Sequence, residues 1–260
     1  MRSLALPVMT LCWREVTRFR RQRSRLVGAF VQPLVFWILL GGGLRASFQP
    51  PGTPSGTSYV EYVYPGIIVM VLLFTAIFST ISVVEDRRQG FLQGVLVAPV
   101  GRSSIVLGQA LGGTVLALVQ GVLFLALAPV AGISLSVLAA LAVTAVMFLV
   151  SFGLTSLGLV IAWRLDSTQG FHAIMNLILI PMWVLSGAFF PVSGVPTWIE
   201  WTMRVNPLTY GMAAIRRCLY LGNPAVAGTV PPLGTSLAIT VIFCLLAFVA
   251  ATDAARRSTA

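Results

Sequence analysis

The chain has 260 residues, of which 57% are hydrophobic and 9% charged, and its formal net charge is +10. This balance leaves too little polar surface for a water-soluble globule of that size, so it predicts an integral membrane protein. The positive charge comes from 17 arginines and no lysine. Because the arginines are confined to short segments between apolar stretches, the charge does not indicate a nucleic-acid-binding protein.

The first segment in chain order is a basic arm, residues 1–25. Apolar residues recur in it at spacings of three and four, at Met9, Cys12, Val16 and Phe19. Arginines recur at the same spacings but are offset around the helix, at Arg14, Arg18, Arg21 and Arg25. This pattern predicts an amphipathic helix lying in the membrane interface on the cytoplasmic side. The alternative is a simple positive-inside anchor, which requires the charges but not the apolar stripe.

Six apolar stretches follow, each near the length of ~20 residues that crosses a bilayer as a helix. They cover residues 26–44, 63–84, 104–130, 136–162, 172–190 and 233–251. Six spans place both termini on one side. Thirteen of the 17 arginines lie on that side and four on the other, so the positive-inside rule predicts cytoplasmic termini. Gly108 and Gly112 form a GxxxG pair that predicts close approach of a neighbouring helix.

Ionisable residues are nearly absent from the six stretches. All seven acidic residues fall at predicted ends or in loops, and the single histidine, His172, has no carboxylate near it in the sequence. The three cysteines form no metal or disulfide pattern, and no GxSxG, HExxH or P-loop is present. We therefore expect no catalytic residue, metal or cofactor in this chain, and any transport would take its energy from a partner.

Two loops contain apolar runs that a simple connection between spans would not require. The first, residues 85–103, begins with charged residues and continues with an apolar run to Pro99. It predicts a short helix that docks on a soluble partner, or one that rests on lipid headgroups. The residues assigned to the docking contact are Glu85, Arg87, Arg88, Gly90, Val95, Leu96 and Pro99.

The second loop, residues 191–221, has two apolar pieces that are too short to cross a bilayer. Together they predict a re-entrant helical hairpin in the outer leaflet. Its key residues are Pro191, Pro196, Trp198, Asn206, Pro207 and Tyr210. Three cations, Arg204, Arg216 and Arg217, would either meet cargo or headgroups or anchor the hairpin by snorkelling.

Both loops resemble those of ABC-2 type transporter permeases. The C-terminal match consists of Gly187, Phe189-Phe190-Pro191, Pro196-x-Trp198 and Asn206-Pro207-Leu208-Thr209-Tyr210. The cytoplasmic loop matches through Glu85, Gly90, Leu92 and Pro99, whereas Phe91 and Gln93 replace the family's threonine and second glutamate. These two departures change only polar details of the docking contact, because the apolar run and the proline that would shape it remain.

The resemblance covers nearly the whole chain and implies one all-α ABC-2 transmembrane domain over residues 1–260. It implies a permease subunit that pairs with a second permease copy and with ATP-binding cassette subunits, on which ATP and Mg would bind. The expected activity is outward transport of an amphipathic drug or antibiotic, lipid or lipid-linked glycan across the cytoplasmic membrane of a bacterium, by alternating access. A secondary carrier and an intramembrane lipid-modifying enzyme are the alternatives.

Overall fold

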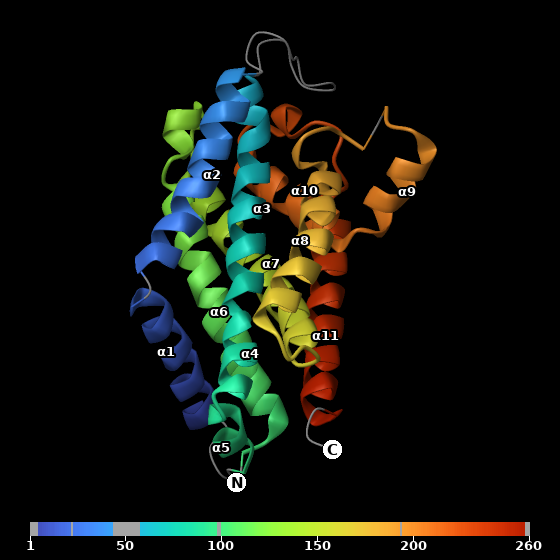
Figure 1. Ribbon diagram of the computed structural model, residues 1–260. Coiled ribbons are helices and arrows are strands. Elements are labelled where there is room, and N and C mark those ends of the chain that lie inside the picture. The colour runs from blue at the N-terminus through green and yellow to red at the C-terminus, as the bar shows by residue number, and fades with distance from the viewer. Residues whose placement is uncertain (1–4, 22, 44–57, 98–99, 193, 258–260) are drawn as a thin grey trace.

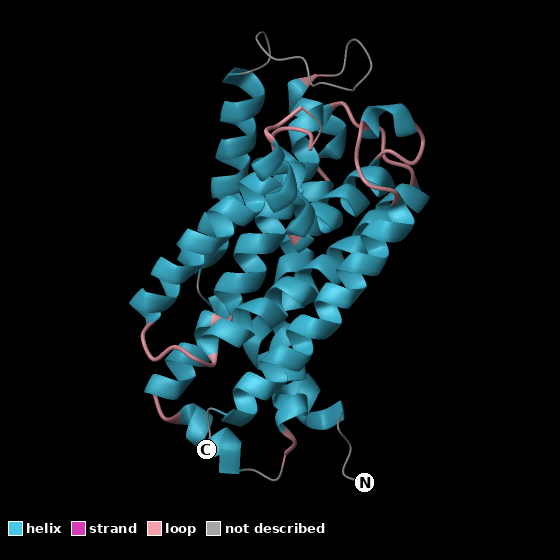
Figure 2. Ribbon diagram, turned by 90° about the vertical axis from the view of Figure 1, so that its right-hand side faces the viewer, coloured by secondary structure: helices cyan, strands magenta, loops and turns pink. Residues whose placement is uncertain are grey.

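A computed structural model describes residues 5–21, 23–43, 58–97, 100–192 and 194–257. Every element within these ranges is helical, and the long helices run roughly along one common direction to form an elongated bundle (Figure 2). The elements are α1 (Ala5–Arg21), α2 (Arg23–Gly43), α3 (Tyr59–Ser79), α4 (Ile81–Arg88), α5 (Phe91–Val97), α6 (Arg102–Leu125), η1 (Ala128–Ala131), α7 (Val137–Ala162), α8 (Thr168–Trp183), η2 (Val184–Ala188), α9 (Thr197–Val205), α10 (Pro207–Leu219), η3 (Pro224–Ala227) and α11 (Leu233–Arg257).

Helix α3 forms the centre of the bundle and packs against α2, α6 and α7. It is apolar on all sides, and an uninterrupted run of buried residues extends from Tyr62 to Leu73. A helix that is hydrophobic all round belongs in the interior of a large bundle. The Ser58 hydroxyl accepts a hydrogen bond from the Val60 amide at the start of α3, which fixes where the helix begins.

Five helical segments are long and apolar enough to cross a membrane: Tyr59–Arg88, Arg102–Leu125, Val137–Ala162, Thr168–Ala188 and Leu233–Arg257. The apolar part of α2, Val27–Gly43, is shorter. The all-α prediction is therefore confirmed, as is the multi-pass character of the chain. The second predicted stretch is longer than expected, because α3 and α4 carry the helix beyond residue 84 to Arg88.

The start of α1 and the end of α11 lie at the same end of the bundle, together with α4, α5 and the turn between α7 and α8 (Figure 1). We call this the α5 end. The connection from α8 to α11, which contains α9 and α10, occupies the other end. Helix α1 does not stand apart from the bundle, because it packs along α6.

The predicted hairpin consists of two unlike helices. Helix α9 projects from the side of the bundle (Figure 1), and only Met203 of its residues is buried. Helix α10 is buried over most of its length and packs against α7 and α11. The break between α8 and α9 includes a π-helical turn in which Gly187 has φ of +85°, a conformation that glycine adopts without strain.

Candidate functional site

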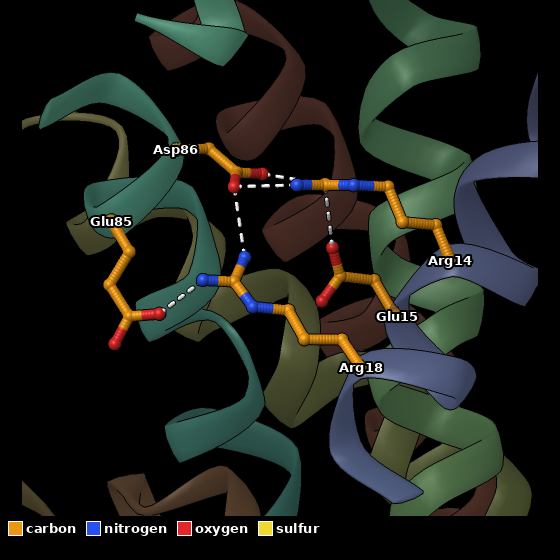
Figure 3. Close-up of polar contacts among 5 residues, drawn as sticks. All are labelled: Arg14, Glu15, Arg18, Glu85 and Asp86. Carbon is orange, nitrogen blue, oxygen red and sulfur yellow. Dashed lines mark hydrogen bonds and ion pairs between the residues drawn. The ribbon is translucent and has the colours of Figure 1, made fainter. Parts of the chain in front are cut away.

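A cluster of charged side chains joins α1 to α4 at the α5 end (Figure 3). Arg14 donates two hydrogen bonds of 2.6 Å to the two carboxylate oxygens of Asp86. Arg18 donates to Asp86 over 2.9 Å and also pairs with Glu85. The Asp86 side chain is 1% exposed, and a two-pronged arginine contact of this kind holds a buried carboxylate in a defined geometry. We call these four residues the α1–α4 latch.

Glu15 lies beside the latch and is itself buried, with 6% of its surface exposed. Burial raises the pKa of its carboxyl above the usual range, while a hydrogen bond with Ser82 and the charge of Arg14 act against this shift. Its pairing with Arg14 is long, at 3.4 Å. The docked position of α1 therefore makes the Glu15 carboxyl bind a proton more tightly than an exposed glutamate does.

Two glycines of α6 allow α1 to approach closely. A methyl group built on Gly108 would lie 2.8 Å from the Leu11 Cβ, and one on Gly112 would lie 2.7 Å from the Glu15 Cβ. The GxxxG prediction of close helix approach is thus confirmed, and the neighbour is the N-terminal arm. The face of α1 that packs on α6 includes the buried Glu15, whereas Met9 of the predicted apolar stripe is exposed.

Helix α5 follows the latch directly and forms the tip of this end of the bundle (Figure 1). Gly90, with φ of +76°, allows the turn between α4 and α5. Leu92 is buried and Val95 packs partly against the core, whereas Val97 is 85% exposed. Arg88 is exposed as well. The side chain of Leu96 and the whole of Pro99 lie outside the described residues.

Arg87 ties α4 to the turn after α7. It donates to the Trp163 carbonyl over 2.7 Å and to the Asp166 carboxylate over 3.0 Å, and its guanidinium stands 5.8 Å from the centroid of the Trp163 ring. Of the residues predicted for the docking contact, Glu85 and Arg87 thus make internal contacts. Their proposed contact with a partner remains a prediction.

At the opposite end, Asn206 and Pro207 form the predicted helix start. The Asn206 carboxamide oxygen accepts from the Leu208 amide over 3.0 Å, and its amide group donates to the Met182 carbonyl over 2.7 Å. Pro207 occupies the first turn of α10. The Tyr210 hydroxyl donates to the Arg204 carbonyl over 2.9 Å. These contacts fix the corner between α9 and α10 against the end of α8.

The remaining predicted hairpin residues lie on or before α9. Pro191 is half-buried in the bend after the π-helical turn, and Pro196 precedes the first residue of α9. Trp198 and Trp201 are 71% and 62% exposed. Such exposed indoles are typical of the boundary between hydrocarbon and headgroups.

The three arginines of the predicted hairpin segment occupy different environments. Arg204 is exposed and pairs with Glu200 one turn before it. Arg216 is 2% exposed, donates to the Tyr62 carbonyl over 3.1 Å, and stands 4.3 Å from the centroid of the Tyr62 ring. Arg217 donates to the carbonyls of residues 230 and 231 over 2.6 Å. Their contact with cargo or headgroups remains a prediction.

A cavity of about 240 Å³ lies where α1, α2, α3 and α8 meet. Its lining combines aromatic and polar side chains, among them Phe74, Phe78, Gln32, Thr75 and His172. His172 is exposed and its ring lies 5.2 Å from that of Phe78. The described residues hold no group of three or more His, Cys, Asp and Glu placed to hold a metal ion. This cavity suits an amphipathic molecule because it offers both kinds of contact.

Sequence reasoning did not find the latch, the exposure of Val97 or this cavity. A signal for the latch was present in the i, i+4 spacing of Arg14 and Arg18 and in the adjacent Glu85 and Asp86. The contact of these arginines with these carboxylates could not be predicted from the sequence, because Arg14 and Asp86 are 72 positions apart.

Comparisons with known proteins agree with this architecture. The model of the family described as ABC-2 type transporter matches residues 7–220. A "Putative transport permease ycf38" from Cyanophora paradoxa is 28% identical over 93% of this chain and 86% of its own length. Nodulation protein J from Rhizobium meliloti is 26% identical over 83% of this chain and 79% of its own. The "Probable multidrug ABC transporter permease YbhR" from Escherichia coli is 29% identical over 65% of this chain and 46% of its own. A multi-pass helical bundle with this family match is a membrane transport permease, and the chain belongs to the ABC-2 type transporter family.

Proposed function

We propose that this chain is the permease subunit of an ATP-driven exporter and moves an amphipathic molecule outward across a bacterial cytoplasmic membrane. Two copies of the chain would form the path and alternate between inward-open and outward-open states. ATP and Mg would bind to a separate ATP-binding cassette subunit, with no hydrolysis by this chain. The α5 end, with both termini, would face the cytoplasm.

The observation that carries this proposal is the way α5 is connected to the bundle. Its exposed Val97 lies at the tip, and the preceding α4 is held by the latch on one side and by Arg87 on the other. Since α4 continues the central helix α3 after Thr80, a push on α5 would reach the middle of the spans. A partner that changes shape on ATP hydrolysis needs such a stiff connection.

The cargo class is supported by the mixed aromatic and polar cavity beside α3, and by the name of one relative, a probable multidrug permease. Drugs or antibiotics, lipids and lipid-linked glycans all combine an apolar body with polar groups. A secondary carrier, the alternative, would transport with a proton gradient and without an ATPase subunit. Such transport in purified vesicles would overturn the proposal.

The test of coupling uses Val97→Asp in vesicles that contain the permease and its ATPase partner. We expect transport-linked ATP hydrolysis to fall at least about fivefold, because a charge placed in an apolar contact weakens docking. Val95→Asp and Leu96→Asp should uncouple hydrolysis in the same way. The matched control is Val130→Asp, since Val130 is 75% exposed at the opposite end. Equal hydrolysis in Val97→Asp and Val130→Asp would refute docking at α5.

A further inference from the structure

Helix α1 carries a basic pocket and an apolar groove that share one side chain. The pocket, of about 440 Å³, is lined by Trp13, Arg14, Thr17, Arg18 and Arg21. The groove, of about 640 Å³, runs between α1 and α6 and also contains Trp13. Its other lining residues include Met9, Val16, Leu111 and Val115. A continuous site with a basic end and an apolar end matches a ligand with the same two parts.

The basic end keeps positive charge after the internal ion pairs are made. Two guanidinium groups, those of Arg14 and Arg18, are matched by the carboxylates of Asp86 and Glu85, and Glu15 is a further, longer partner of Arg14. Arg20 and Arg21 are exposed, and no carboxylate of the described residues forms an ion pair with either. The pocket therefore offers the Arg21 guanidinium, which pairs with no carboxylate of the described residues, together with the Thr17 hydroxyl, and these are groups that bind phosphate.

The apolar end exposes more hydrophobic side chain than a surface in contact with water usually carries. Leu6, Met9 and Trp13 are each 71% exposed, and they stand together along one side of α1 beside α6. Large apolar side chains grouped in this way mark a surface that is covered by lipid or protein. Trp13 lies at the boundary between the two parts, as indole does between hydrocarbon and headgroups.

We propose that this site binds an anionic phospholipid of the surrounding membrane. The phosphate would lie at Thr17 and Arg21, the glycerol region beside Trp13, and an acyl chain over Val16, Leu111 and Val115. A zwitterionic lipid fits the groove equally well but gains less from the arginines, so the site selects by headgroup charge. The inference depends on the membrane location of the chain and not on its cargo or its ATPase, so it can fail or hold independently of the proposed function.

The experiment is native mass spectrometry of the purified full chain in detergent, with phosphatidylglycerol and phosphatidylcholine of identical acyl chains. We expect phosphatidylglycerol to be retained preferentially. Arg21→Gln should weaken its retention about fivefold, the effect of one arginine near an anionic lipid, and Arg21→Lys should restore it. Val115→Trp should fill the groove and weaken retention of both lipids without changing any charge.

The controls separate this site from other sources of binding. Arg164→Gln removes an exposed arginine in the turn between α7 and α8, which lines neither the pocket nor the groove, and should leave retention unchanged. An equal loss in Arg164→Gln and Arg21→Gln would show general surface charge and overturn the proposal, as would equal retention of the two lipids. Full competition by soluble glycerophosphoglycerol or by inorganic phosphate would show a phosphate site without an acyl groove. Loss of lipid only when an ATPase partner is added would assign the surface to that protein instead.

Discussion

Arg216 is a cation held inside the protein by the chain itself. Its guanidinium meets the Tyr62 ring and the carbonyls of Tyr62 and Gly187, so it links α10 to α3 and to the π-helical turn. A buried charge of this kind is stabilised only while these partners remain in place. Its burial indicates a structural role in the conformation seen here.

We expect Arg216→Gln to lower stability by about 1.5–3 kcal/mol, the range for hydrogen bonds to a charged group. The thermal unfolding midpoint of the purified chain measures this loss. Arg204→Gln is the control, since the Arg204 side chain is 58% exposed and an exposed pair contributes about 0.3–0.5 kcal/mol. If Arg216→Gln kept the wild-type midpoint but changed the preference among cargo molecules, the residue would belong to the transport path.

The second prediction at residue scale concerns Glu15. Because burial raises the pKa of its carboxyl, the docked arm binds a proton more tightly than the free arm does. The stabilisation that protonation of Glu15 gives is present at low pH and is lost as the pH rises from the ordinary carboxyl range through the raised pKa. The charged groups that face it are Arg14 and Arg18 on α1 and Asp86 on α4.

Glu15→Gln should remove this part of the pH dependence. The measurement is the thermal midpoint across pH 5 to 8 for both proteins, with the variant expected to lose less stability toward the high end. Parallel curves for the two proteins would show that Glu15 does not change its protonation on docking.

At the scale of elements, the contact between α1 and α6 depends on the absence of side chains at two positions. We expect Gly108→Leu to displace α1, because even a Cβ at this position would come within 2.8 Å of Leu11 and 3.0 Å of the Val8 carbonyl oxygen. Limited trypsin digestion measures the effect, since displacement frees the arginines of α1 for cleavage. Gly94→Leu is the control, because a Cβ there meets nothing within 4 Å. Equal digestion of the two variants would contradict the tight packing.

The sequence predicted the existence of elements better than their surroundings. The sequence predicted the helix start at Asn206 and Pro207 and the close helix approach at Gly108. Each of these features depends on residue types next to one another or one helical turn apart, and so can be recognised without knowledge of distant partners. The burial of Glu15 and of Arg216 could not, since both depend on partners from distant helices, Ser82 and Tyr62. For the same reason, the amphipathic pattern of the arm indicated a helix but not that Glu15 would be buried against α6.

At the scale of the whole molecule, the latch constrains the path of the chain. Arg14 precedes α2 and Asp86 follows α3, yet the two side chains are in contact. If α3 crosses the membrane, α2 must cross it too. The apolar part of α2 is short, at Val27–Gly43, but 17 residues of helix at 1.5 Å each still approach the thickness of the hydrocarbon core.

We therefore expect six crossings, with both termini on the cytoplasmic side. The test replaces the three native cysteines, Cys12, Cys218 and Cys244, and introduces single cysteines at Ser103 or Ala225. A reagent that does not cross membranes should label position 225 in intact cells and position 103 only after lysis. The reverse pattern would invert the orientation, and labelling of both positions in intact cells would contradict the topology.

The latch also has a consequence for how the chain is made. During synthesis Arg14 emerges 72 residues before Asp86, a delay of about 4–14 s at ordinary elongation rates. Throughout that interval the arginines of the arm have no partner on α4, so they can act as the retained charge that orients the first span. Only when the second span has entered the membrane does Asp86 become available to neutralise them. The same side chains would thus serve insertion first and the mature structure afterwards, and variants at Asp86 should insert correctly yet fail to close the arm.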